Sequence, residues 1–249
     1  MSEHTMNRVL FKIFVGVVLF TVSVLFAGCH GGKESKEEKM AKQVIPYEAK
    51  DFSYLIGMPG LSEAALKLHF TLYQGYVNNT NRLLDELKAL AEHGQSNTPQ
   101  YAELKRRFAF EFDGMKLHEL FFENLGTTPS SPDPKSAFYK AIEANFGSFD
   151  SWQNDFIATA QMRGIGWAVL FYDPSTGRLM NAWINEHHSG LLAQCVPLLV
   201  LDVFEHAFVV DYQLDRPSYI KAMLQQIDWK VVEARFEGKP VQKGKPVAK

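Results

Sequence analysis

The chain has 249 residues, of which 46% are hydrophobic and 22% are charged. This composition is typical of globular proteins and excludes disordered, collagen-like and polytopic membrane proteins. Its 26 Lys and Arg against 28 Asp and Glu leave no basic excess for a phosphate backbone, so we expect no nucleic-acid partner. Two cysteines, Cys29 and Cys195, are too few for a disulfide framework.

Residues 1–28 have the pattern of a signal peptide. Arg8 and Lys12 precede an apolar run that is shorter than the roughly 20 residues of a membrane-spanning helix and ends in small residues before Cys29. The run LFAGC resembles the bacterial lipoprotein box, in which the cysteine becomes the lipid-bearing first residue, although Phe26 stands where an aliphatic residue is usual. An uncleaved anchor and a non-lipidated signal are the alternatives. We expect an exported lipoprotein on the periplasmic or cell-surface side, anchored to a membrane through Cys29, with residues 29–44 as a lipidated tether.

Two long helices are predicted for residues 45–127. Apolar residues recur at helical spacing up to about residue 93, with a start at Leu61-Ser62-Glu63. A second helical stretch covers residues 100–125 and is stopped by Gly126 and the Pro-rich TTPSSPDP loop. The two helices can fold back on each other, which predicts a helical hairpin domain.

Residues 128–249 have a mixed pattern. Helices are predicted at 136–146 and 151–163, strands at 166–172, 179–185 and 198–202, and a helical tail at 217–236, with the turn sequence DPSTG between the first two strands. The order predicts an α+β fold: a long helical hairpin followed by a C-terminal α/β domain with a three-stranded antiparallel sheet.

Four residues stand out as candidate metal ligands. Asp202 and His206 are four positions apart, which on one helical turn would point both side chains the same way. His69 and His118 lie on the apolar sides of the two long helices, where a hairpin could aim both imidazoles at one point. Three imidazoles and a carboxylate suit iron, manganese or zinc. For each histidine taken singly, the alternative interpretation is a packed core residue that binds no metal.

The neighbourhood of these residues resembles the iron/manganese superoxide dismutase family. DVFEHAF at residues 202–208 is similar to the family signature Asp-x-Trp-Glu-His-Ala-Tyr. FDGMKLHELFFENL, LHFTLYQGYVNNTN and GIGWAVL are similar to its second-helix, first-helix and strand runs, so the resemblance covers roughly residues 45–236. It implies one iron or manganese ion per subunit, held by His69, His118, Asp202 and His206, and conversion of superoxide to oxygen and hydrogen peroxide. Zinc is excluded for this reaction because it has no one-electron cycle.

The resemblance also implies roles around the metal. Tyr76 would be the tyrosine at the substrate entrance. In the loop INEHHSG we favour His187 as the residue that tunes the metal-bound solvent, ahead of His188 and Glu186; the alternative is that both histidines are exposed loop residues. Glu205 would reach across a homodimer to the partner's ligand histidine.

The sequence departs from the family pattern near the entrance. Tyr76 follows His69 by seven residues, one fewer than usual, which two regular helical turns accommodate. Aligning the first helix with the family pattern without a gap would instead put Leu68 at the ligand position. The family's second entrance histidine falls on Tyr73 or Leu72. These changes leave two other functions open: a catalytically silent metal-binding surface lipoprotein of the same fold, and a different, peroxidase-like redox activity.

Overall fold

The computed structural model describes residues 44–241 and 243–246. Apart from Val44, they belong to one unit that begins at Ile45. The predicted signal peptide, residues 1–28, and Cys29 lie outside the described residues, as does all of the predicted tether except Val44. Within the described part of the chain, no helix combines the length and apolarity needed to cross a membrane.

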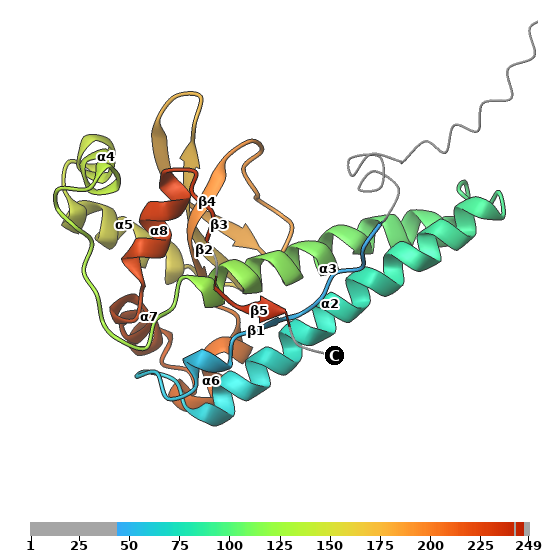
Figure 1. Cartoon of the computed structure of the whole chain (residues 1–249), viewed down its shortest axis with the longest axis horizontal. Coiled ribbons are helices and arrows are strands. Elements are labelled where there is room, and N and C mark those ends of the chain that lie inside the picture. The colour runs from blue at the N-terminus through green and yellow to red at the C-terminus, as the bar shows by residue number, and fades with distance from the viewer. Residues whose placement is uncertain (1–43, 242, 247–249) are drawn as a thin grey trace, which may run out of the picture. The chain divides into compact units, whose positions relative to one another are not determined.

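Two antiparallel helices form the first half of this unit (Figure 1). α2 spans Glu63–Glu92, and Ser62 caps it by accepting a hydrogen bond from the Ala65 amide at 3.1 Å. α3 spans Pro99–Glu123 and is capped in the same way by Thr98. The predicted helical hairpin is confirmed. The segment before α2 contains a two-residue strand, β1 (Lys50–Asp51), and a 3-10 turn, η1 (Ser53–Leu55).

The second half contains a three-stranded antiparallel sheet, as predicted. The strands are β2 (Gly166–Asp173), β3 (Arg178–Asn185) and β4 (Val196–Asp202), in the order β3-β2-β4. The central strand β2 begins at Gly166, whose φ of +149° and 2.0 Å separation between an added Cβ and the Ile184 carbonyl oxygen exclude any larger residue. Trp167 faces Asp202 in the register, so the start of β2 lies beside the end of β4.

Helices cover this sheet and complete the fold. α4 (Ala137–Phe146) and α5 (Phe149–Ala160) contact β3, and α3 and α8 (Trp229–Phe236) contact β4. α6 (Glu205–Tyr212) and α7 (Arg216–Gln225) follow β4, and α6 packs against α2. A last two-residue strand, β5 (Lys245–Pro246), pairs with β1. The core that joins these layers includes Trp152, Trp167, Phe121, Phe122 and Tyr219, all buried.

The structure corrects the predicted helices 151–163 and 217–236 and the start of the predicted strand 198–202, which begins at Val196. α5 begins at Phe149 rather than Ser151, because Ser148 caps it by accepting a hydrogen bond from the Ser151 amide. The tail is two helices rather than one. Between them, residues 226–228 pair with the end of α3: the Gly126 amide donates to the Gln226 carbonyl at 2.8 Å and the Asp228 amide donates to the Asn124 carbonyl at 2.9 Å. These bonds replace those that a continuous helix would make, and Asp228 then caps α8.

Candidate metal centre

Four side chains from four elements meet between the two halves of the unit. His69 on α2, His118 on α3, Asp202 at the end of β4 and His206 on α6 each offer one ligand atom, and these atoms all lie within 4.8 Å of one another. His69, His118 and Asp202 are buried, and His206 is half-buried. The group can therefore hold one metal ion.

Asp202 is at the centre of the group. Its Oδ2 lies 3.1 Å from His69 Nε2, 3.1 Å from His206 Nε2 and 3.6 Å from His118 Nε2. The expectation that Asp202 and His206 share a helical turn was wrong, because Asp202 ends a strand and α6 begins only at Glu205. The Phe204 amide donates to Asp202 Oδ1 at 2.9 Å, and this tight corner brings His206 back to the carboxylate.

His118 gives the clearest indication that the group suits a cation. Its Nδ1 lies 2.6 Å from the Gly114 carbonyl oxygen, which only accepts, so Nδ1 carries the proton and Nε2 presents a lone pair. Nε2 is buried without a hydrogen-bond partner in the described part of the chain. An unmet polar atom of this kind costs about 1–3 kcal/mol, and a metal ion bound to Nε2 would remove that cost.

The protonation states suit a divalent ion. Burial would raise the pKa of Asp202, but His206 and His69 outweigh burial and hold its pKa well below the usual range. Burial lowers the pKa values of His69 and His118. Burial also opposes the charged form of His206, whose pKa is nevertheless raised by Asp202. One carboxylate and three imidazoles form a mixed nitrogen–oxygen donor set of the kind that iron and manganese accept, with no thiolate.

A second layer of hydrogen bonds lies beside the four side chains. Tyr76 Oη is 2.7 Å from His187 Nε2, and the indole Nε1 of Trp167 donates to His187 Nδ1 at 3.1 Å. Because an indole N–H only donates, Nδ1 must be the unprotonated nitrogen of the neutral ring. The proton therefore sits on Nε2, which donates to Tyr76 Oη, and the phenol proton remains free to be donated elsewhere.

Both members of the Tyr76–His187 pair are neutral near pH 7. Burial lowers the pKa of His187 to about 4 and raises the pKa of Tyr76 well above its usual value. His187 reaches this position because the loop after β3 is tight, with Asn185 and Ser189 exchanging backbone hydrogen bonds and Glu186 at a φ of 52°. The His187 ring is buried and stacks on Phe204, whereas His188 is exposed.

The short spacing on α2 is accommodated without a break. α2 is a continuous α-helix from Glu63 to Glu92, so residues seven apart lie nearly two turns apart on the same side. His69 is buried and belongs to the four-residue group, whereas Leu68 is 52% exposed and its side chain has no donor atom. Tyr76 packs over Gly114 on α3, where an added Cβ would lie 2.7 Å from the Tyr76 ring.

Two contacts of this layer were not anticipated from the sequence. The indole bond of Trp167 and the close approach at Gly114 depend on contacts between distant segments, although a glycine four residues before His118 inside a helix was an available signal. Outside this layer, Arg216 donates to the backbone carbonyls of Met162 and Gly164 at 2.8 Å. Glu205 is exposed as the first residue of α6.

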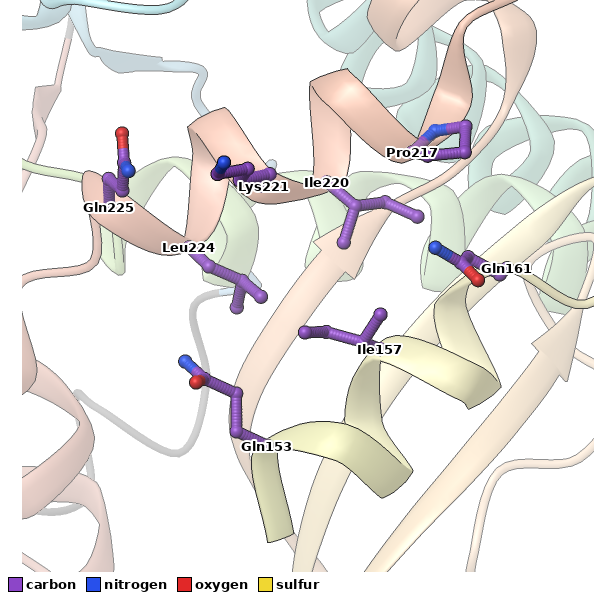
Figure 2. A pocket seen from close by; sticks show the side chains of 8 residues that line it. All are labelled: Gln153, Ile157, Gln161, Pro217, Ile220, Lys221, Leu224 and Gln225. Atoms are coloured by element: carbon purple, nitrogen blue, oxygen red, sulfur yellow. The ribbon is translucent and has the colours of Figure 1, made fainter. Parts of the chain in front are cut away.

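A separate cavity of about 530 Å³ lies between α5 and α7. Figure 2 shows Ile157 from α5 and Ile220 and Leu224 from α7 directed into it, with Gln153 and Lys221 at its edge. Its lining contains no imidazole, carboxylate or thiol. The cavity therefore offers no metal-binding chemistry, and the four-residue group is the candidate centre.

Comparisons with known proteins agree with this geometry. Residues 45–126 match the alpha-hairpin domain of iron/manganese superoxide dismutases, and residues 134–235 match the C-terminal domain of the same enzymes. A protein of Aquifex pyrophilus named as an iron superoxide dismutase is 37% identical over 195 residues, covering 76% of this chain and 91% of the relative.

Relatives named for either metal are similar at comparable levels. A protein of Haloferax volcanii named as a manganese superoxide dismutase is 34% identical over 194 residues, covering 78% of this chain and 93% of the relative. One from Methanothermobacter marburgensis, named for iron, is 33% identical over 209 residues, covering 82% and 98%. The two matched domains, these relatives and the four converging ligand atoms lead to one conclusion: the chain belongs to the iron/manganese superoxide dismutase family of enzymes.

Proposed function

We propose that this protein converts superoxide to oxygen and hydrogen peroxide with a single iron or manganese ion held by His69, His118, Asp202 and His206. The observation that carries the proposal is the convergence of these four ligand atoms within 4.8 Å, including the unpartnered Nε2 of His118, beside the Tyr76–His187 pair. A bound iron or manganese ion supplies one-electron redox chemistry, accepting an electron from one superoxide and returning it to the next.

The chain's own residues have distinct tasks in this reaction. The Asp202 carboxylate offsets part of the charge of the ion, while the three neutral imidazoles add none. The peroxide product requires two protons. Tyr76 can donate its phenol proton towards the substrate, and the hydrogen bond that its Oη accepts from His187 Nε2 stabilises the resulting phenolate until solvent returns a proton. Trp167 maintains the tautomer of His187 that this transfer requires.

The decisive experiment follows superoxide decay by stopped flow on the full-length protein loaded with iron and, separately, with manganese. Fast decay that is proportional to metal content is expected with at least one metal. His206→Ala should lose the metal, and Tyr76→Phe should keep the metal but slow turnover at saturating superoxide. A metal-loaded protein with no superoxide decay would instead be a silent metal-binding protein, and decay of peroxide alone would indicate a different redox activity.

A homodimer is part of the proposal. Glu205 is exposed beside the candidate ligand His206, and its exposure supports a contact with a second copy. Exposed apolar side chains lie on α6 and the segment that follows it, namely Val209, Val210 and Leu214. We expect a dimer by analytical ultracentrifugation, and Glu205→Gln should shift the equilibrium towards monomers. A wild-type monomer at micromolar concentration would contradict this part of the proposal.

Export and anchoring are also proposed, on the strength of the N-terminal sequence. A lipid on Cys29 would hold the enzyme at a membrane on the periplasmic or cell-surface side. Cys29→Ser should move the protein from the membrane fraction to the soluble fraction. If the variant remains in the membrane fraction, the N-terminal segment acts as an uncleaved anchor.

A further inference from the structure

One cation lies close to the Tyr76–His187 pair. The Phe110 ring of α3 contacts the His187 ring, with centroids 4.5 Å apart, and the Tyr76 ring, with centroids 6.2 Å apart. The guanidinium carbon of Arg107, one turn earlier on α3, lies 4.1 Å from the centroid of Phe110. The Arg107 side chain is 52% exposed, so a solute approaching this side of the site meets its charge.

A carboxylate lies beside this cation. Glu111 forms an ion pair with Arg107 at 2.5 Å and accepts a hydrogen bond from Asn79, and its side chain is only 3% exposed. The exposed His188 lies against Phe110. Since Glu111 is covered and Arg107 is half exposed, an anion arriving from solvent encounters the guanidinium before the carboxylate.

These charges act on the reacting pair. Burial and Asp202 have the largest effects on the pKa of Tyr76, followed by Glu111, which raises it, and Arg107, which lowers it. Burial has the largest effect on the pKa of His187 and lowers it, whereas Asp202 raises it; Arg107 adds a smaller lowering effect after those of His206 and His188. The opposite signs mean that Arg107 and Glu111 compete at this entrance.

We infer that Arg107 is a positioning residue that draws small inorganic anions past Phe110 to the Tyr76–His187 pair, offsetting the repulsion from Glu111. The inference rests on the proposed function, in which superoxide is the anion. A single charge acting through water across a few ångströms changes a local anion concentration about two- to fourfold. The effect must weaken as salt screens the charge.

The first test is the salt dependence of superoxide decay in the metal-loaded full-length enzyme. Arg107→Gln should lower kcat/KM about two- to fourfold when the Debye length is roughly 30 Å, and much less when it is roughly 8 Å. The value of kcat should not change, because the encounter of superoxide with the enzyme does not limit turnover at saturating superoxide. The matched control is Arg106→Gln, which removes the same charge one residue away; Arg106 is 71% exposed and pairs with exposed Glu103. This control should retain the wild-type kcat/KM.

A purely structural role of the ion pair predicts different results. Removing Arg107 leaves Glu111 buried without its cation, so Arg107→Gln alone could perturb packing. Glu111→Gln separates the two roles: electrostatic guidance predicts about a twofold rise in kcat/KM at low salt, whereas a structural pair predicts a loss. A kcat/KM unchanged in Arg107→Gln, a loss independent of salt, or a loss in Glu111→Gln would each overturn the inference.

A binding measurement makes the inference testable without turnover. Sodium azide is a small monovalent anion whose binding to the metal-loaded protein can be followed by optical titration. Arg107→Gln should weaken azide binding about two- to fourfold at low salt, and Arg106→Gln should not. If azide binding depends on Arg107 while no form consumes superoxide, the proposed function fails and this inference holds. If azide binding is the same in both variants, this inference fails.

Discussion

At the scale of single residues, the position of one proton on His187 decides the direction of the hydrogen bond between Tyr76 and His187. The Trp167 indole fixes that proton on Nε2 by donating to Nδ1. Trp167→Phe keeps a buried aromatic ring but removes the donor, so the other tautomer becomes accessible and the bond to Tyr76 reverses. We expect turnover at saturating superoxide to fall roughly tenfold, the equivalent of about one hydrogen bond, with metal content unchanged.

Trp152→Phe is the matched control for this substitution. Trp152 is equally buried and its indole also donates a hydrogen bond, but to Asn181 between α5 and β3. This variant should lose stability while keeping the wild-type turnover per bound metal. Equal losses of turnover in the two variants would show that the effect comes from packing rather than from the His187 tautomer.

Asp113 predicts a pH dependence of stability. Burial raises its pKa to about 6, and nearby His188 opposes the shift only in part. The folded state therefore binds this proton more tightly than the unfolded state, so the contribution is present below pH 3.8 and is lost as the pH rises through about 6. Asp113→Asn should gain about 1 kcal/mol over wild type at pH 7, allowing for solvent screening. Urea unfolding at pH 7 and below pH 4 tests this, and a gain of equal size at both pH values would contradict it.

At the scale of elements, two glycines inside helices have opposite roles. Gly114 on α3 leaves room for the Tyr76 ring to pack against the helix, because an added Cβ there would lie 2.7 Å from that ring. Gly75 on α2 has nothing within 4 Å of an added Cβ. Gly75→Ala should stabilise the protein by up to about 1 kcal/mol through helix propensity. Gly114→Ala should displace Tyr76 and slow turnover several-fold.

The comparison of the two variants is informative because the chemical change is the same. Thermal unfolding and superoxide decay are measured for both. A Gly114→Ala protein with wild-type turnover would show that α2 and α3 can separate slightly without moving Tyr76 away from His187.

The elements themselves were predictable where the pattern is local. Helical periodicity and the caps at Ser62 and Thr98 determine the hairpin, and the DPSTG turn determines the β2–β3 pair. The break between α7 and α8 was not predictable, because it depends on backbone bonds from Asn124 and Gly126, about a hundred positions earlier in the chain. The β1–β5 pairing likewise joins opposite ends of the described chain.

At the scale of the whole molecule, the candidate site combines predictable and unpredictable parts. The four candidate ligands could be named from the signature around His206 and from two helical histidines, and the structure brings all four together. The sequence could not predict how Asp202 meets His206, because a spacing of four residues fits either one helical turn or a turn from a strand into a helix. Trp167 and Gly114 act on Tyr76 and His187 only through tertiary contact, which no local pattern contains.

Because the candidate ligands come from α2, α3, β4 and α6, metal binding should couple the hairpin to the sheet and raise the stability of the whole unit. At a free metal concentration of about 1,000 times the Kd, the expected gain is about 4 kcal/mol, or on the order of 10 °C in Tm. Thermal unfolding of the apo-protein with and without added Mn²⁺ or Fe²⁺ measures this gain. His118→Ala should abolish it, and His93→Ala, which changes an exposed histidine at the end of α2, should keep it. Equal stabilisation of both variants would mean that the metal binds elsewhere, because His118 Nε2 would then not be a ligand.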